Sequence, residues 1–534
     1  QGSPLPLLAA CRARRDDPHA AWQTLEASFA RGLWEEVERR RVRPLTADEQ
    51  HRVIALTADL QRVRDQLVHL ETLPEEQRDH DAVEALESRR AGLLTEAVEL
   101  DAALSRRYDG SRPGALSIDR IAAALRPHSA LVAWLDVSCG GPEPIERFGF
   151  ILLPDGTARC VDLPGSGPAG TWTSDDQQLL DRFRAGLESV DAPVHSRGAG
   201  LVRIEPSDAL ARREEIDRDA ARLRSLLIDP LRTILDGADV HDLVVVPSGP
   251  LAKIPLQALT DDFGLSYVPS GSLLASLRSR PRTRARGLLA VGAPELADDT
   301  PVDFRGAGLG PLPFGKREIE SVATFLGIDE RTVLIGQDAT ESRLLGLAQD
   351  GALSRYRYVH FATHAVIDEV DPMSSALLLT STSAGDTLST AGTGRPYDDG
   401  WLTAEEIRRG WRIDADLVTL SACRTGIGGG FGFISFADAL LSAGARGLVL
   451  SRWKVDDRAT ALLMRRFYSN LGQRSLSPAA ALRDAQHWLR GLDAKRVSEL
   501  TAELTGGRAR ETSGTESPPF AHPYYWAAFV FVGG

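Results

Sequence analysis

Residues 416–426 read DLVTLSACRTG, an apolar run that ends at Cys423 and a polar turn. Short, continuously apolar runs bounded by turn residues are typical of strands buried on both faces of a parallel sheet. Helical patterns separate the predicted strands. Further strands of this kind are predicted at 242–248, 286–294, 356–364 and 446–453, and helices at 435–445, 458–471 and 477–490. The sequence therefore predicts an α/β fold with a mostly parallel sheet flanked by helices.

The chain has 534 residues, too many for one ordinary domain. We predict a helical region over 1–110, a small α/β segment over 111–209 that packs on the main domain, and the main domain over 210–534. In the first region, leucine and valine recur at steps of three and four over 53–70 and 83–104. This spacing indicates either an antiparallel coiled-coil hairpin or two ordinary core helices.

The composition argues against several classes of protein. The formal net charge of −12 opposes nucleic-acid binding through bulk electrostatics. No apolar stretch approaches the ~20 residues of a membrane span, so we expect no membrane association. The four cysteines contain no C-x-x-C pair, which argues against a disulfide framework and against a zinc site. A cytoplasmic location is the simplest expectation for such a chain.

A literal G-x-G-x-x-G occurs at Gly165, Gly167 and Gly170. In a dinucleotide site this motif follows a strand and opens a helix whose N-terminus holds the pyrophosphate. Here Pro168 lies inside the motif, and TWTSDDQQ follows it without opening a helix on the phosphate side. We therefore predict a loop at this motif and no cofactor.

Two predicted strands run into residues that are useful for catalysis, His364 and Cys423. Because reactive groups collect at the carboxyl ends of parallel strands, we expect these two side chains to meet at one edge of the sheet. A neighbouring imidazole can form a thiolate and later protonate a leaving amine. For Cys423 alone, an inert core cysteine is the better interpretation, and the histidine at the neighbouring strand end favours a nucleophile.

His360 and His364 form an H-x-x-x-H pattern that resembles a metal pair. On a strand, four steps separate the two residues by about 13 Å, which a single zinc ion with bonds near 2 Å cannot bridge. We therefore expect no metal, and we assign His360 a structural role.

Several segments of residues 210–534 occur in an order that carries a family resemblance. They include LVVVPSGPLAKIPLQAL, VHFATHA, LVTLSACRTG, SFADALLSAGARGLVLSRWKVDD and YYWAAFVFVGG. Together they resemble CHAT domains, caspase-like cysteine peptidases of clan CD that are related to separase and caspases. The resemblance implies a caspase-like fold, preceded by a region similar to the end of a tetratricopeptide array.

The same resemblance implies roles for single residues. His364 matches the catalytic histidine, Cys423 matches the nucleophile, and the backbone N–H groups of Cys423 and Ala365 match an oxyanion hole. Caspases have glycine at the position of Ala365. If that position needs a positive φ, alanine would be strained there and the hole poorly formed.

Asp456 and Asp457 follow another predicted strand, on the same side of the sheet as Cys423. A carboxylate in a narrow pocket would pair with an arginine or lysine of the substrate. The W-x-V-x-D pattern of this segment resembles separases, which favour arginine before the cleaved bond, and the match selects Asp457. The alternative is that these acids cap the following helix, where negative charge stabilises the N-terminus.

These observations predict a cysteine endopeptidase that cleaves a protein substrate through His364 and Cys423. The resemblance implies regulated activation, a regulatory protein or sensor as partner, and a role in prokaryotic defence. Two alternatives remain open: a catalytically silent caspase-like scaffold or partner-binding module, and a small-molecule hydrolase with the same dyad.

Overall fold

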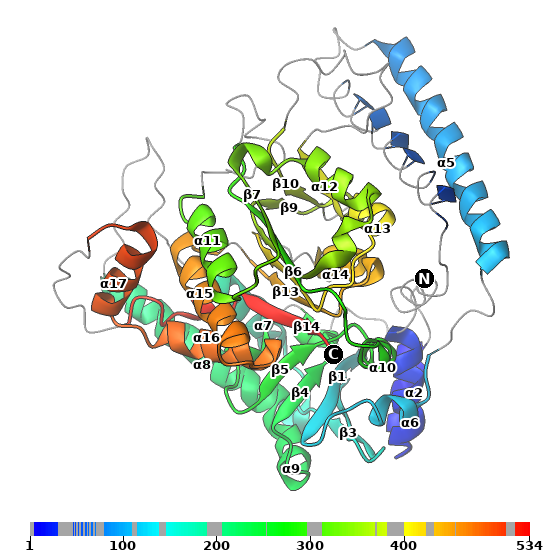
Figure 1. Ribbon diagram of the computed structural model, residues 1–534. Coiled ribbons are helices and arrows are strands. Elements are labelled where there is room, and N and C mark those ends of the chain that lie inside the picture. The colour runs from blue at the N-terminus through cyan, green and yellow to red at the C-terminus, as the bar shows by residue number, and fades with distance from the viewer. Residues whose placement is uncertain are drawn as a thin grey trace.

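A computed structural model gives the arrangement of most of the chain (Figure 1). It describes scattered positions between 46 and 70 and twelve continuous ranges. These are 5–29, 79–108, 115–137, 146–188, 206–252, 254–295, 312–368, 371–381, 400–422, 432–453, 455–508 and 518–534.

The core of the molecule is one eleven-stranded sheet with the strand order β3-β2-β1-β4-β5-β14-β13-β12-β8-β6-β7. In chain order, its strands are β1 (Ser129–Val137), β2 (Glu146–Leu152), β3 (Ala158–Asp162), β4 (Asp242–Val245), β5 (Gly264–Tyr267), β6 (Gly287–Gly292), β7 (Arg331–Ile335), β8 (Tyr356–Ala362), β12 (Leu417–Ser421), β13 (Gly447–Ser451) and β14 (Phe529–Gly533). Most neighbours pair in parallel, and β1–β2, β2–β3 and β13–β14 pair antiparallel. The predicted mostly parallel sheet is confirmed.

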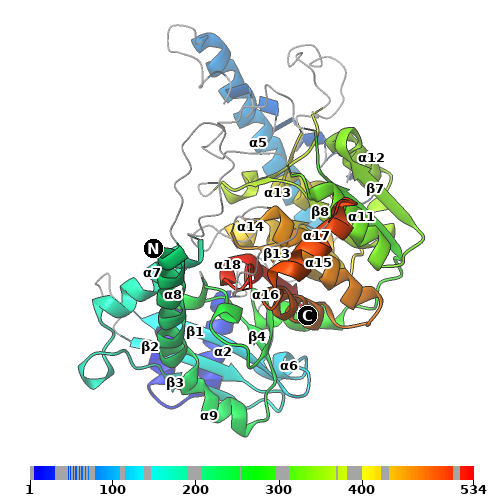
Figure 2. The same cartoon turned by 90° about the vertical axis from the view of Figure 1, so that its left-hand side faces the viewer.

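Helices cover both faces of this sheet, as the parallel strands require. Figure 1 shows α11, α15 and α16 on one face and α10 and α14 on the other, and Figure 2 turns the first of these faces toward the viewer. The α-helices are α1 (Leu5–Ala13), α2 (Pro18–Phe29), α5 (His80–Tyr108), α6 (Ile118–Ala122), α7 (Ser174–Glu188), α8 (Pro206–Leu227), α9 (Asp229–Gly237), α10 (Gly271–Ser279), α11 (Gly315–Phe325), α12 (Glu341–Gln349), α13 (Ala404–Gly410), α14 (Gly432–Ala443), α15 (Asp457–Gly472), α16 (Pro478–Arg490), α17 (Ala494–Thr505) and α18 (Pro523–Trp526).

A small second sheet lies beyond β8. It has the order β11-β10-β9, with strands β9 (Ala365–Val366), β10 (Ala376–Leu378) and β11 (Trp401–Thr403). Thr363 joins it to the main sheet, because the Thr363 N–H donates to the Ser421 carbonyl at 3.3 Å and the Thr363 hydroxyl donates to the Leu378 carbonyl. The second sheet therefore begins where the central strands end.

The strands of the segment 111–209 belong to the main sheet, since β1 pairs with β4 in parallel. The N-terminal helices α1 and α2 pack on this part of the sheet, where Trp22 and Leu25 lie fully buried beside Phe150. The buried carboxylate of Glu26 accepts the N–H groups of Gly271 and Ser272, at 3.0 and 2.7 Å, at the N-terminus of α10. The N-terminal helices are thus tied to the main domain by a cap as well as by apolar packing.

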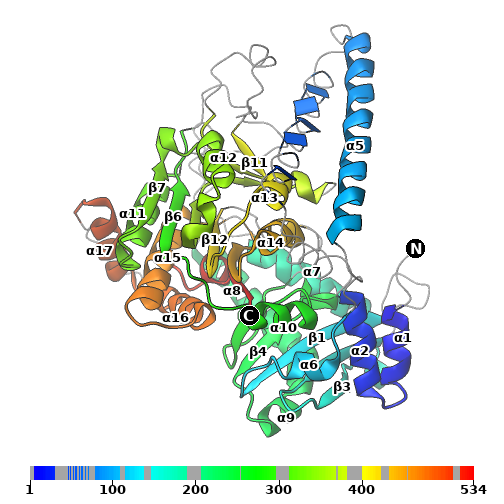
Figure 3. The ribbon, with the colours of Figure 1, turned by 45° about the vertical axis from the view of Figure 1, so that its right-hand side comes forward.

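The predicted helix 83–104 lies within α5, which stands apart from the sheets in Figure 3. The described positions of 53–70 are helical, and Val63 and Leu67 among them are buried. An ion pair of 2.9 Å joins Glu49 to Arg107, so the start of the first segment lies beside the end of the second. This arrangement agrees with an antiparallel pair of helices.

The G-x-G-x-x-G motif forms a closed loop, as predicted, but the expectation that no helix opens after it is wrong, because α7 begins at Ser174. The Gly165 N–H donates to Gly170 at 2.8 Å and the Gly167 N–H donates to Thr171 at 2.9 Å, so both donors are used inside the loop. A Cβ at either position would overlap Thr171, which explains the need for glycine.

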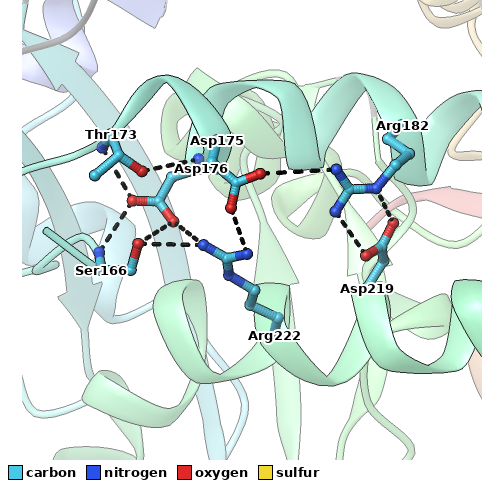
Figure 4. Close-up of polar contacts among 7 residues, drawn as sticks. All are labelled: Ser166, Thr173, Asp175, Asp176, Arg182, Asp219 and Arg222. Atoms are coloured by element: carbon cyan, nitrogen blue, oxygen red, sulfur yellow. Dashed lines mark hydrogen bonds and ion pairs between the residues drawn. The ribbon is translucent and has the colours of Figure 1, made fainter.

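The carboxylate of Asp176, in the first turn of α7, holds this loop from outside (Figure 4). It accepts the Ser166 N–H at 3.0 Å, the Ser166 hydroxyl at 2.8 Å and the Thr173 N–H at 3.0 Å, and it pairs with Arg222. Burial acts to raise the pKa of Asp176, but these hydrogen bonds outweigh it and lower the pKa to about 2. An ionised carboxylate of the chain itself thus takes the N–H donors of Ser166 and Thr173 in this loop.

Candidate active site

The predicted catalytic histidine lies between the two sheets. Strand β8 ends at Ala362, Thr363 and His364 follow, and β9 begins at Ala365. The Leu378 N–H donates to the His364 carbonyl at 2.9 Å, which fixes the backbone of this residue against β10. His364 as a whole residue is only 6% exposed.

The strand that precedes Cys423 lies next to β8. β12 and β8 pair in parallel and in register, with Ser421 opposite Ala362, so both strands end at the same edge. The Ser451 hydroxyl, at the end of β13, donates to the Ala422 carbonyl and fixes the last described residue before the cysteine. Cys423 itself lies outside the described residues. The predicted adjacency of the two strands is confirmed, and the His364–Cys423 contact stays a prediction.

The backbone of Ala365 suits the role that the resemblance assigns to it. His364 and Leu378 form a hydrogen-bonded pair across β9 and β10, and the next pair, Ala365 with Leu377, is of the other kind. The Ala365 N–H therefore points away from β10. Because Ala365 lies in a strand with extended backbone, the expected strain from a positive φ does not arise.

Asp456 and Asp457 lie beyond the end of β13, which is the other neighbour of β12. The Asp456 side chain accepts the Ala459 N–H at 2.8 Å and is the N-cap of α15. Asp457 is the first residue of that helix, and its Oδ2 accepts the Phe314 N–H at 2.7 Å, just before α11. The capping alternative thus holds for Asp456, while Asp457 bonds to another helix.

The environment of Asp457 favours its protonated form. Burial is the main cause that raises its pKa to about 7, the bond from Phe314 opposes the rise, and the carboxylates of Glu318 and Asp456 add to it. A carboxyl group that is half protonated near neutral pH is common at functional sites. A cation placed beside it would restore the ionised form.

His360 belongs to a buried polar chain that crosses from α11 to the sheet. Its Nε2 lies 2.9 Å from Oε1 of Glu318, and its Nδ1 lies 2.9 Å from the hydroxyl of Tyr468. That hydroxyl donates to Thr419 at 2.8 Å, so Nδ1 of His360 donates to Tyr468. Both ring nitrogens are used within this buried chain, which agrees with the structural role predicted for His360. The contacts of Glu318 and Tyr468 with His360 could not be predicted from the sequence, because nothing in the residues around either one indicates that it lies beside His360.

The described ranges contain no group of three or more histidine, cysteine, aspartate or glutamate side chains that could hold a metal ion. Within the same ranges, no helix is both long enough and apolar enough to span a bilayer.

Comparison with known proteins identifies the family of this chain. The model of the CHAT domain family matches residues 217–534, which is more than half of the sequence. The chain belongs to the CHAT domain family. The match lies inside the main domain predicted over 210–534, and it covers every residue assigned to the candidate site.

One curated relative is tetratricopeptide repeat protein 28 of Homo sapiens, which is 26% identical over 338 residues. The match covers 55% of this CHAT chain and 12% of the human protein. Among solved structures, two of the Saccharomyces cerevisiae separase–securin complex match with TM-scores of 0.40 and 0.39 at 12% and 11% identity. They cover 96% and 99% of this chain, which spans 36% and 44% of the matched chains.

Proposed function

We propose that this CHAT domain is a cysteine endopeptidase with His364 and Cys423 as its catalytic dyad. The observation that carries the proposal is the register of β8 and β12, which ends both strands at one edge and two residues before each member of the dyad. The parallel topology ends β8 and β12 at the same edge, although 59 positions separate His364 from Cys423 in the sequence. Membership of the family supports the same assignment.

In this mechanism His364 takes the proton of the Cys423 thiol, and the thiolate attacks the carbonyl carbon of the peptide bond. The oxyanion that forms would receive hydrogen bonds from the backbone N–H groups of Ala365 and Cys423. His364 then gives its proton to the leaving amine, and a thioester forms. Water, deprotonated by His364, hydrolyses the thioester and restores the thiol. No step of this sequence calls for a cofactor.

The environment of Asp457 supports a preference for a basic residue before the cleaved bond. One of its oxygens accepts the Phe314 N–H, and β13, which leads to it, lies next to β12. An arginine or lysine of the substrate would pair with the other oxygen and would favour the ionised carboxylate. Asp456 is engaged in capping α15, so we assign selectivity to Asp457 and give Asp456 a supporting role.

Two observations bear on control of the enzyme. His364 is nearly inaccessible, and the human relative carries a repeat-protein name. We therefore propose that a regulatory protein opens the site before a protein substrate enters. A role in prokaryotic defence rests on the family resemblance alone. The same two observations favour a second candidate, a silent CHAT scaffold that binds partners.

A thiol-reactive peptide probe with arginine in the position before the warhead distinguishes the two candidates. We expect the probe to label the native chain at Cys423, with no labelling in Cys423→Ala and strongly reduced labelling in His364→Ala. Cleavage of an arginine-containing protein substrate should likewise be seen with the native chain, absent in Cys423→Ala and strongly reduced in His364→Ala. Labelling of Cys423 without any cleavage, in the presence of its regulator, would support the scaffold instead.

A further inference from the structure

A cavity of about 540 Å³ opens at the other end of the central strands. The first residues of β12 and β13, Leu417 and Gly447, line it together with Tyr358 near the start of β8. Phe531 of the antiparallel strand β14 lies at the same edge. The cavity is therefore at the amino edge of β8, β12 and β13, opposite the edge that leads to His364.

The side chains that line this cavity are strongly basic. They include five arginines, Arg126, Arg278, Arg286, Arg357 and Arg446, and a single acid, Asp416. Asp416 lies between two of them, with Oδ2 at 2.7 Å from Nε of Arg357 and Oδ1 at 3.9 Å from Nη1 of Arg446. Asp414, outside the lining, lies 2.8 Å from Nη2 of Arg446, so two carboxylates offset two of the five arginines. The cavity keeps an excess of positive charge in a chain whose net charge is −12.

Several guanidinium groups have unused hydrogen-bonding capacity. Arg126, Arg278 and Arg286 make no ion pair with any residue that the structure describes, although Nη1 of Arg278 donates to the Ala124 carbonyl at 2.5 Å. The buried Nε atoms of Arg278 and Arg446 have no hydrogen-bond partner within the described ranges. Burial, followed by the charge of Arg126, lowers the pKa of Arg278 to about 10, so the group is still charged at neutral pH. Buried donors of this kind normally have a partner.

A helix N-terminus adds to the positive potential. Ser477, Pro478 and Ala479, at the start of the 13-residue helix α16, line the same cavity. The N-terminus of a helix carries a partial positive charge that favours anions. The arginines and this helix come from separate parts of the chain and converge on one space.

We propose that this cavity binds a small soluble molecule that carries two or more phosphate groups. Planar guanidinium groups bind phosphate oxygens in bidentate fashion, and several of them suit a ligand with several phosphates. The volume falls in the range of about 300–1,000 Å³ that is usual for small-molecule sites. The acidic surface of the whole chain disfavours a long nucleic acid, which would need a wider basic surface.

The ligand would add a bridge between elements that already contact one another through Asp416 and through Arg280, whose Nη1 donates to the Ala445 carbonyl at 3.2 Å. Arg278 lies at the end of α10, Arg357 lies in β8, and Arg446 lies directly before β13. A ligand that binds only the folded chain stabilises it in proportion to the logarithm of its concentration. Binding is therefore measurable as a rise in melting temperature, whether or not the chain cleaves a substrate.

The test titrates the full chain with sodium tripolyphosphate, by calorimetry and by thermal unfolding. We expect binding of one ligand per chain at concentrations below about 1 mM. The double variant Arg126→Gln/Arg286→Gln should weaken it by about 100-fold or more, because two charge-assisted contacts to the phosphates are lost. Both side chains are exposed, so the fold should not change. The matched control is Arg496→Gln in α17, away from the cavity, with a change of less than about 2-fold.

Two results would overturn the proposal. One is tripolyphosphate binding that is absent at about 1 mM, or equal in the native chain and the double variant. The other is a single-stranded oligonucleotide that binds more tightly than tripolyphosphate and loses affinity in the same double variant, which would make the cavity part of a nucleic-acid surface. Either result is independent of the catalytic assignment.

Discussion

The two ends of strands β8, β12 and β13 differ sharply in chemistry. The carboxyl edge carries an almost inaccessible histidine and an aspartate with a pKa raised to about 7, whereas the amino edge carries five arginines around a cavity. The same buried apolar strands separate the two groups. Strand polarity explains the difference, since parallel strands gather all their carboxyl ends on one side and all their amino ends on the other.

The largest expected effect is at the carboxyl edge. Cys423→Ala and His364→Ala should each lower kcat by at least about 10³-fold, because the members of a dyad act as a unit. The double variant should lose no more activity than the more damaging of the two single substitutions. Thermal melting should change little in Cys423→Ala, since Cys423 lies outside the β8–β12 ladder. Turnover that persists in a clean Cys423→Ala preparation would remove the dyad from this edge.

The next-largest effect concerns the buried hydrogen-bonded residues Glu318, His360 and Tyr468, which lie between the two edges of the sheet. His360→Ala leaves Glu318 buried without its partner, so we expect the free energy of unfolding to fall by about 3 kcal/mol. Tyr468→Phe is the matched control, because it keeps the ring and removes one hydroxyl, at a cost of about 1 kcal/mol. Denaturant unfolding measures both. If His360→Ala unfolds like the native chain but is inactive, His360 is catalytic and its structural assignment is wrong.

A smaller effect should separate Asp457 from the dyad. Asp457→Asn should lower kcat/KM for a peptide with arginine before the cleaved bond by about 10- to 100-fold, and should leave a leucine peptide nearly unchanged. In the native chain, kcat/KM for the arginine peptide divided by kcat/KM for the leucine peptide should rise as the pH passes through about 7. The reason is that the ionised carboxylate binds the arginine side chain of the peptide. The ratio should be independent of pH in Asp457→Asn. A native chain that prefers leucine or aspartate at this position would contradict the assignment.

The raised pKa of Asp457 also predicts how the stability of the folded chain depends on pH. Its pKa is higher in the folded chain, about 7, than the ordinary value of 3.8, so between these values the folded state holds a proton that the unfolded state has released. The contribution of Asp457 to stability therefore falls as the pH rises from about 4 to about 7. Unfolding curves at several pH values should show a shallower decline in Asp457→Asn. An unchanged decline would mean that the aspartate is ionised throughout.

The strands of the sheet, and the edge of the sheet at which His364 lies, could be predicted from the sequence. Continuous apolar runs such as 417–421 identify strands of a parallel sheet, and this topology alone decides which residues share an edge. The G-x-G-x-x-G motif was also correctly predicted to be a loop on the ground of Pro168, although the second ground, that no helix opens after it, was wrong, because α7 begins at Ser174. Both successes rest on patterns that are local in the sequence.

The parts that sequence reasoning missed depend on tertiary packing. Asp457 meets Phe314 only because α11 packs beside α15, and the residues are 143 positions apart. The same packing brings Glu318 to His360. The arginines of the amino edge come from positions between 126 and 446, and each by itself is indistinguishable from a solvated surface arginine. No local pattern encodes such convergence.

The smallest expected effect distinguishes the two neighbouring acids. Asp456→Ala removes the N-cap of α15 and should lower the free energy of unfolding by about 1 kcal/mol. Asp456→Asn should restore most of this loss, because asparagine also accepts the Ala459 N–H. Neither variant should change the preference for arginine over leucine peptides, which we assign to Asp457. If Asp456→Ala reduces that preference as much as Asp457→Asn while Asp456→Asn keeps it, displacement of the helix N-terminus controls selectivity, and the carboxylate of Asp457 is not the direct partner of the substrate.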